Sequence, residues 1–230
     1  MNVRIVLADD HRILREGVAA LLRQTPGFEV VAEASDGAEL VRLVRELQPD
    51  VVVTDLSMPG LNGIEAISRI VEHSPRTRTL CLSVHDEKRL VAAVMDAGAS
   101  GYLLKDCAFE ELLRAVRTVL ANQMYISPAV AGALVEDFRE RRSGIDRRSN
   151  AFSVLTSRER EVVQLIAEGH STKAIADRLH VSAKTIGTHR EHILSKLKAS
   201  GTADLTRYAI REGLAGLESP SHAAGERHAD

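Results

Sequence analysis

The chain has 230 residues, which is more than one average domain, so we expect two compact units. Trp is absent and aromatic residues make up 3% of the chain, so the cores must be aliphatic, and a base-stacking platform for single-stranded nucleic acid is not expected. The first apolar stretch is broken by Asp9 and Asp10, and Cys81 and Cys107 are too few for a disulfide framework. Because apolar runs of about 20 residues do not occur either, we expect a cytoplasmic protein with neither a secretory signal nor a membrane span.

Charge is distributed unevenly along the chain, whose net charge is −2. Residues 1–121 carry 14 Lys and Arg against 18 Asp and Glu, whereas residues 151–217 carry 10 against 7. Residues 122–150 have a surplus of one positive charge and residues 218–230 a surplus of two negative charges. An acidic first half and a basic second half indicate different partners, and anionic nucleic acid is a candidate for the basic half.

Short apolar runs alternate with helical patterns through the first half of the chain. The runs are rich in Val and Leu and lie at 3–8, 28–34, 51–54, 79–84 and 101–104. Between them apolar residues recur at helical spacing, as at Leu40, Val44 and Leu47. Five strand–helix units of this kind predict a doubly wound α/β domain with a five-stranded parallel sheet, whose ligands bind at the carboxyl ends of the strands.

The second half divides into a polar connection and a helical unit. Residues 136–150 are charged and almost free of apolar side chains, which predicts a solvated linker, and a short helix is expected just before it, within 125–135. From residue 156 every pattern is helical, and four helices are expected to begin near Thr156, Ser171, Ser182 and Thr202. We therefore predict an α/β domain at 1–121, a linker at 122–150, an all-α four-helix domain at 151–217 and a disordered tail at 218–230.

Polar residues follow the predicted strands at one edge of the sheet. Asp9 and Asp10 come directly after the first strand, Asp55 after the third, Ser83 lies near the end of the fourth, and Lys105 ends the fifth. Three carboxylates that converge there would repel one another unless a hard cation neutralised them, and Mg²⁺ suits such a donor set. A carboxylate beside Mg²⁺ can attack phosphorus, while a lysine and a hydroxyl hold the phosphoryl oxygens.

Ordinary structural roles are an alternative for each of these residues. Asp9 and Asp10 could cap the helix expected at residue 12, and Asp55 could cap a turn. Ser83 and Lys105 could be a strand-end hydroxyl and a solvated loop residue. Polar residues of this kind at four strand ends nevertheless favour a site.

The helical unit contains two helices around the short turn His180-Val181-Ser182, an arrangement typical of a helix-turn-helix. In the second of these helices, Ile186 and Ile193 share an apolar face, and Lys184, Thr188, Glu191 and Ser195 fall on the opposite face. Cations that could meet DNA phosphates are Lys173, Lys184, Arg190, Lys196 and Lys198. A small helical bundle that binds protein is the alternative.

The motifs VLADDH, VVVTDLSMPGLNGIEA, LSVHD and GASGYLLKD resemble the receiver domain of bacterial response regulators over about residues 3–120. The segments LTSRERE and GHSTKAIADRLHVSAKTIGTHREHILSKL resemble the LuxR-type helix-turn-helix, and this second likeness extends over about 153–215. Together the two halves resemble two-component response regulators of the NarL/FixJ subfamily. This resemblance implies a flavodoxin-like receiver followed by a DNA-binding domain.

For the receiver, the resemblance implies that Asp55 is the phosphoacceptor for a sensor histidine kinase. It also implies that Asp10, Asp55 and the backbone carbonyl of Ser57 hold Mg²⁺, with Asp9 acting partly through water. One departure from the family lies nearby, because many receivers have a cis-proline where this chain has Asp106.

The same resemblance implies which residues respond to the phosphoryl group. Lys105 would pair with the phosphoryl oxygens, Ser83 would hydrogen-bond the phosphoryl group, and Tyr102 would rotate inward. Ser57 and His85 lie where the family tunes the lifetime of the phosphoryl group.

For the DNA-binding domain, the resemblance implies contacts of two kinds. Thr185, His189 and Lys196 would contact the DNA backbone, while Lys184, Gly187, Thr188 and Glu191 would face bases or lie close to them. We expect Thr188 to touch a thymine methyl and Glu191 a cytosine amine. Gly187 stands where the family often carries a longer side chain, and the fourth helix would supply a dimer face.

These features predict a phosphorylation-controlled DNA-binding transcription regulator and not an enzyme. Phosphorylated Asp55 would favour a state free to dimerise, whereas the unphosphorylated receiver would shield or disorder the DNA-binding domain. The expected partners are a sensor histidine kinase, double-stranded promoter DNA and a second copy of the chain. A contact with RNA polymerase is compatible with this function, and no membrane partner is expected.

Three alternatives stay open. An aspartyl phosphatase of the haloacid-dehalogenase type requires a second aspartate two residues after its nucleophile, where this chain has Ser57. A small-molecule sensor requires an enclosed apolar pocket. A phosphate-independent, dimerising DNA-binding regulator would not use the strand-end residues for phosphorylation.

Overall fold

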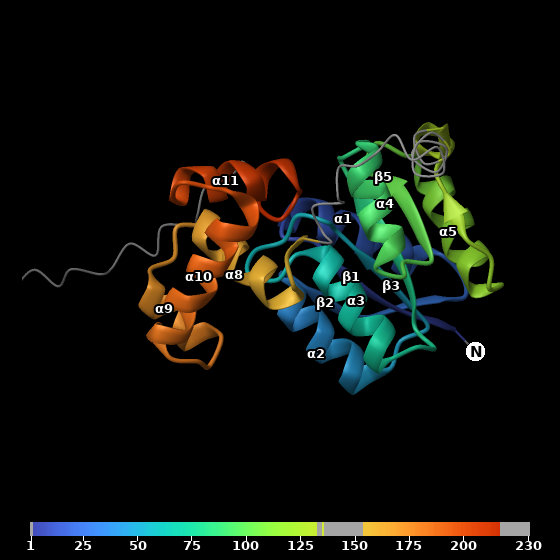
Figure 1. The fold of residues 1–230 in the computed structure, drawn as a ribbon. Helices are drawn as coiled ribbons and strands as arrows, with labels where there is room; N and C mark the ends of the chain where they lie inside the picture. Colours follow the sequence, from blue (N-terminus) through green and yellow to red (C-terminus); the bar gives the residue numbers. More distant parts are fainter. Residues whose placement is uncertain (1, 133–134, 136–153, 217–230) are drawn as a thin grey trace, which may run out of the picture.

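The structure, a computed structural model, describes residues 2–132, 135 and 154–216. They form an α/β unit and a helical unit that lie side by side (Figure 1). The predicted linker at 136–150 and tail at 218–230 fall outside the described residues. Among the helices that are described, none combines the length and the apolar character needed to cross a bilayer.

The α/β unit is built on a parallel sheet. Its strands are β1 (Val3–Ala8), β2 (Phe28–Ala34), β3 (Val51–Thr54), β4 (Arg78–Ser83), β5 (Gly101–Leu104) and β6 (Tyr125–Ile126). The spatial order is β2-β1-β3-β4-β5-β6, and every neighbouring pair is parallel. The doubly wound parallel fold predicted from the sequence is thereby confirmed.

The sheet has a sixth strand where the sequence predicted the start of a short helix. The Tyr125 amide donates to the Ser100 carbonyl at 3.1 Å and the Ser127 amide to the Tyr102 carbonyl at 2.9 Å, so this dipeptide extends the edge of β5. Two residues are too few to show the alternation that marks a strand. Helical conformation begins only afterwards, at 128–132.

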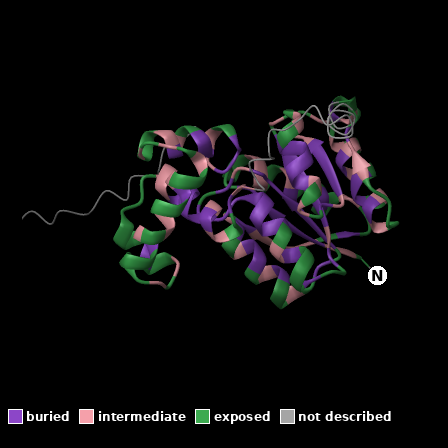
Figure 2. Ribbon diagram, in the orientation of Figure 1, coloured by how far each residue is buried: buried purple, intermediate pink, exposed green. Residues whose placement is uncertain are grey.

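Helices cover both faces of the sheet. They are α1 (Arg12–Gln24), α2 (Gly37–Leu47), α3 (Gly63–His73), α4 (Lys88–Asp96) and α5 (Phe109–Leu120). Because successive strand residues point to opposite faces, Ile5 and Leu7 pack with α1 and α5, whereas Val6 and Ala8 pack with α2 and α3. Figure 2 shows the result, a sheet buried between two helical layers.

The helical unit contains the four predicted helices, α8 (Ser157–Ala167), α9 (Thr172–Arg178), α10 (Ala183–Leu197) and α11 (Thr202–Arg211). Thr156 and Glu159 form the predicted capping box, and the side chains of Ser171 and Ser182 cap α9 and α10. The apolar face of α10, with Ile186 and Ile193, lies in the core of this unit.

Candidate functional site

The strand-end residues come together because the strands that carry them are neighbours. β1, β3, β4 and β5 are adjacent in the sheet and parallel, so their carboxyl ends meet at one edge. Asp9, Asp55 and Lys105 directly follow β1, β3 and β5, and Ser83 is the last residue of β4. The predicted convergence is therefore observed.

Lys105 bridges two buried carboxylates at this edge. Its Nζ lies 2.8 Å from Asp9 Oδ2 and 2.8 Å from Asp55 Oδ2. Each aspartate is only 3% exposed, so the ammonium group supplies the charge partner that buried carboxylates require. Burial raises the pKa of Asp55 above its usual range, although the neighbouring Lys105 acts to lower it. Burial acts to lower the pKa of Lys105, but the carboxylates of Asp55 and Asp9 outweigh burial, so the pKa of Lys105 is raised.

The remaining carboxylate oxygens could hold a cation. One ligand atom from each of Asp9, Asp10, His11 and Asp55 lies within 4.8 Å of the others. Three carboxylates with Asp10 partly exposed to water fit the oxygen donors and retained waters that Mg²⁺ prefers. His11 was not among the predicted residues, although its place beside Asp10 in the sequence could have indicated it.

Capping of α1 does not account for Asp9 and Asp10, the two aspartates that follow β1. The N-cap of α1 is His11, which makes no side-chain capping bond, and Asp9 Oδ1 accepts from the His11 amide at 2.8 Å. Asp55 Oδ1 does accept from the Leu56 amide at 2.6 Å, so a local turn bond accompanies its contact with Lys105.

The predicted switch residues lie beside the acidic edge. Tyr102 is fully buried, its hydroxyl donates to the His85 carbonyl at 2.6 Å, and burial raises its pKa far above the usual range. The Ser83 hydroxyl accepts from the His85 amide at 3.1 Å, and His85 Nε2 lies 3.2 Å from Ser57 Oγ. The tyrosine that was expected to rotate inward is therefore already buried in this structure. His85 contacts this tyrosine as well as Ser83 and Ser57.

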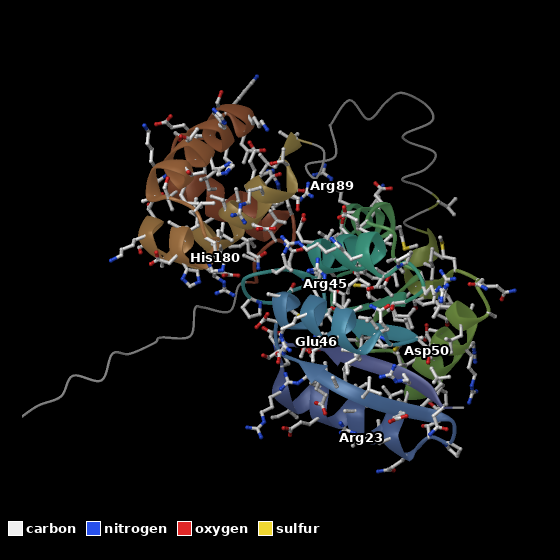
Figure 3. All side chains as sticks on the ribbon, turned by 90° about the horizontal axis from the view of Figure 1, so that it is seen from below. Arg23, Arg45, Glu46, Asp50, Arg89 and His180 are labelled. Atoms are coloured by element: carbon white, nitrogen blue, oxygen red, sulfur yellow. The ribbon has the colours of Figure 1, made fainter. Side chains whose placement is uncertain are left out.

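On the helical unit, most of the residues predicted to meet DNA lie on the surface. The exposed ones are Lys173, Lys184, Thr185, Thr188, Glu191 and Lys196, and Gly187 and His189 are half-buried. A shallow groove of about 300 Å³ follows α10 and is lined by Ser182, Lys184, Thr185, Thr188, His189 and His192. Figure 3 places His180 in the turn of the helix-turn-helix, and Arg45 and Arg89 on α2 and α4 of the other unit.

Two of the predicted phosphate-binding cations have partners within the protein. Lys196 Nζ lies 2.7 Å from Glu159 Oε2, the carboxylate of the capping box of α8, and Arg190 donates to Thr202 Oγ1 at 2.6 Å. His192 was missed in the sequence although it lies seven residues after Thr185 and three after His189, which puts it on the same stripe of α10.

Comparison with known proteins gives the family. The response regulator receiver domain matches residues 5–117, and the family described as bacterial regulatory proteins, luxR family, matches residues 153–209. The oxygen regulatory protein NreC of Staphylococcus carnosus is 40% identical over 215 residues, which cover 92% of this chain and 99% of NreC.

Solved structures agree with this assignment. A two-component response regulator of the LuxR family from Aurantimonas sp. SI85-9A1 is 41% identical, with a TM-score of 0.58, and covers 61% of this chain and 100% of its own. The response regulator RcsB in complex with DNA is 29% identical, with a TM-score of 0.56, and covers 92% of this chain and 99% of its own. The chain therefore belongs to the NarL/FixJ subfamily of two-component response regulators, transcription regulators that join a receiver domain to a LuxR-type DNA-binding domain.

Proposed function

We propose that this response regulator accepts a phosphoryl group on Asp55 from a sensor histidine kinase and thereby changes its dimerisation and its affinity for promoter DNA. The observation that carries the proposal is the position of Asp55, which is 3% exposed at the end of β3 and lies 2.8 Å from Lys105. Response regulators as a class interact with histidine kinases and DNA, and RcsB has been solved with DNA bound.

In the proposed transfer, an Asp55 carboxylate oxygen forms a bond to phosphorus while the bond from phosphorus to the kinase's histidine nitrogen breaks. Lys105 already lies between Asp55 and Asp9, so its ammonium group can hold the phosphoryl oxygens as negative charge gathers on them. Asp9, Asp10, Asp55 and the carbonyl of Ser57 would hold Mg²⁺, which when bound neutralises negative charge at the site.

The acyl phosphate on Asp55 would then move the neighbouring loop. Ser83 and Tyr102 both bond to His85, so a hydrogen bond from Ser83 to the phosphoryl group would alter the contacts that hold Tyr102 inward. His85 and Ser57 are in contact at 3.2 Å beside the same carboxylate, which supports their proposed influence on phosphoryl lifetime.

We propose that the receiver spans residues 1–121 and the DNA-binding domain residues 151–217. The DNA-binding domain would place α10 in the major groove. Lys184, Gly187, Thr188 and Glu191 would face bases or lie close to them. The proposed contacts with DNA phosphates come from Lys173, Thr185, His189 and Lys196, and we add His192 from its place in the groove of α10. Lys196 would have to exchange Glu159 for a phosphate. A homodimer through α11 and a contact with RNA polymerase are further parts of this proposal.

The test of the phosphoacceptor is the intact mass after incubation with Mg²⁺ and acetyl phosphate. We expect the wild-type chain to gain one phosphoryl group and Asp55→Asn to gain none, because the nucleophilic carboxylate is then an amide. Asp177→Asn, an exposed aspartate of α9, is the matched control and should still gain the group. A wild-type chain that gains nothing from acetyl phosphate or from phosphorylated kinases would favour the phosphate-independent regulator.

A further inference from the structure

The turn between β1 and α1, which carries two carboxylates of the acidic edge, is bonded to an arginine of α1. Arg15, in the first turn of that helix, donates from Nη1 to the Asp9 carbonyl. The Arg15 side chain is 15% exposed, so little water competes for this hydrogen bond. A charged donor in a partly dry place is therefore fixed on the backbone of the turn.

Glu33, at the end of β2, holds Arg15 in this orientation. Arg15 Nε lies 3.6 Å from Glu33 Oε2, and Arg23 Nη2 lies 2.8 Å from Glu33 Oε1. The carboxylate thus pairs with one arginine from each end of α1, and Figure 3 labels the second of them, Arg23. Because a guanidinium group is planar and rigid, a partner at Nε also sets the direction of Nη1.

Asp9 is bonded through its side chain as well as through both backbone polar groups. The Asp9 amide donates to the Ala34 carbonyl at 3.2 Å, and Asp9 Oδ1 accepts from the His11 amide at 2.8 Å. Asp9 Oδ2 lies 2.8 Å from Lys105 Nζ. The bond from Arg15 completes this set at the carbonyl oxygen, so the position of the residue is fixed from every polar group.

Asp10 is the residue whose position depends on the anchored carbonyl. The Asp9 carbonyl lies in the peptide plane that joins the two aspartates, so fixing it sets the direction in which the Asp10 side chain leaves the backbone. The Asp10 side chain is 36% exposed, so packing restrains it less than it restrains the buried Asp9 and Asp55. One ligand atom of Asp10 nevertheless lies within 4.8 Å of those of Asp9 and Asp55.

We propose that Arg15 is a positioning residue for the divalent cation: by holding the Asp9 carbonyl, it keeps Asp10 where Asp10 and Asp55 can share one ion. Arg15 is not itself a ligand, because a guanidinium group has no lone pair to offer. Groups that orient metal ligands in this way affect metal affinity nearly as much as some ligands do. This inference rests on the Mg²⁺ site of the proposed function and adds a residue outside that site which determines its affinity.

The positive charge of Arg15 acts in the opposite sense, because a cation beside the site disfavours a second cation. Loss of Arg15 would therefore strengthen cation binding if charge prevailed, and would weaken it if the anchored carbonyl prevailed. We expect weaker binding, because Glu33 lies against the guanidinium group and offsets its charge. The sign of the change thus separates the two explanations.

The test measures binding of the metal alone to the full-length, unphosphorylated chain. Mn²⁺ accepts the same oxygen donors as Mg²⁺, and its unbound form is counted by electron paramagnetic resonance. We expect Arg15→Ala to bind Mn²⁺ about tenfold more weakly than the wild-type chain. The Mg²⁺ concentration for half-maximal phosphorylation by acetyl phosphate should rise by the same factor, whereas the rate at saturating Mg²⁺ should stay close to that of the wild-type chain.

Two further variants separate this effect from charge and from helix packing. Arg15→Lys keeps the charge but has one nitrogen in place of the two that reach Glu33 and the Asp9 carbonyl, so it should also bind Mn²⁺ more weakly, even if Arg15→Ala folds poorly. Arg23→Ala is the matched control: it removes an ion pair with the same Glu33 without touching Asp9, and it should bind like the wild-type chain.

Asp10→Asn supplies the baseline for a site that has lost a ligand. A wild-type chain that binds Mn²⁺ no more tightly than Asp10→Asn would refute the cation site of the proposed function. Wild-type affinity that both Arg15 variants retain, or tighter binding by Arg15→Ala, would refute the role of Arg15. An equal loss in Arg23→Ala would also refute it, because the packing of α1 on β2 would then be responsible.

Discussion

At the scale of single residues, the acidic edge depends on Lys105. Asp9 and Asp55 are both buried, and Lys105 is within 2.8 Å of each. A buried carboxylate without a cation or hydrogen-bond partner is costly, so the lysine has a structural effect as well as its proposed role with the phosphoryl oxygens. The two effects can be separated by measuring folding and phosphorylation on the same variant.

Lys105→Met should lower the rate of phosphorylation by acetyl phosphate by about 10- to 100-fold, because no ammonium group stabilises the charge on the phosphoryl oxygens. The rate is followed by intact mass, and thermal unfolding shows whether the receiver stays folded. Lys173→Met, at an exposed position of α9, is the control. A folded Lys105→Met protein that is phosphorylated at the wild-type rate would contradict the role proposed for this lysine.

At the scale of elements, the start of α8 and the end of α10 are tied through one carboxylate. Glu159 closes the capping box with Thr156 and pairs with Lys196 at 2.7 Å, so the helix that docks on the receiver is linked to the helix that would enter DNA. Burial raises the pKa of Glu159, but the bonds from Lys196 and Thr156 outweigh burial and hold it below the usual range.

Because the folded state lowers the pKa of Glu159, this group stabilises the fold above its unfolded pKa, and the contribution is lost as pH falls through the folded pKa. We therefore expect Glu159→Gln to be less stable than the wild-type chain at neutral pH, with the difference shrinking in acid. Urea unfolding across this pH range measures it, and Glu29→Gln, an exposed carboxylate of β2, is the control. A stability difference that does not change with pH would show that the charge of Glu159 is unimportant.

At the scale of the whole molecule, the DNA-binding domain contacts the receiver at the loop that follows Asp55, through hydrogen bonds that involve Gln164 and Glu168. The contact is dominated by hydrogen bonds and ion pairs, and the buried members include Asn62, Glu65, Glu161 and Gln164. Interfaces of this polar kind permit domain motion, whereas large apolar ones join domains permanently. Water can therefore replace the partners of this contact if the two units separate.

Arg69→Glu should separate the two units, because it places a second carboxylate against the buried Glu161. We expect a larger radius of gyration by small-angle X-ray scattering and faster exchange of the Asn62 amide. Arg76→Glu, at an exposed position after α3, changes the net charge equally and should leave both unchanged. An Arg69→Glu chain as compact as the wild-type chain would show that the ion pair does not hold the units together.

The sequence alone was sufficient for the local and repetitive features of this protein. Apolar periodicity predicted the first five strands and their helices, and capping residues such as Thr156, Ser171 and Ser182 marked the starts of α8, α9 and α10. The acidic edge could be predicted as well, because parallel strands bring their carboxyl ends together wherever the topology is known. The roles of the individual residues remain predictions that the proposed experiments test.

Only the tertiary structure determined which distant residues meet. The two-residue β6 carries no periodic signal and exists because β5 offers it an edge. Lys196 looks like a free cation until Glu159, 37 residues earlier, is found beside it. Gln164 likewise has no motif of its own: its partners Met58 and Asn62 lie more than 100 residues away, and the contact arises only where the two units meet. Periodicity and capping are properties of neighbouring residues, whereas a contact between domains depends on how their finished surfaces match.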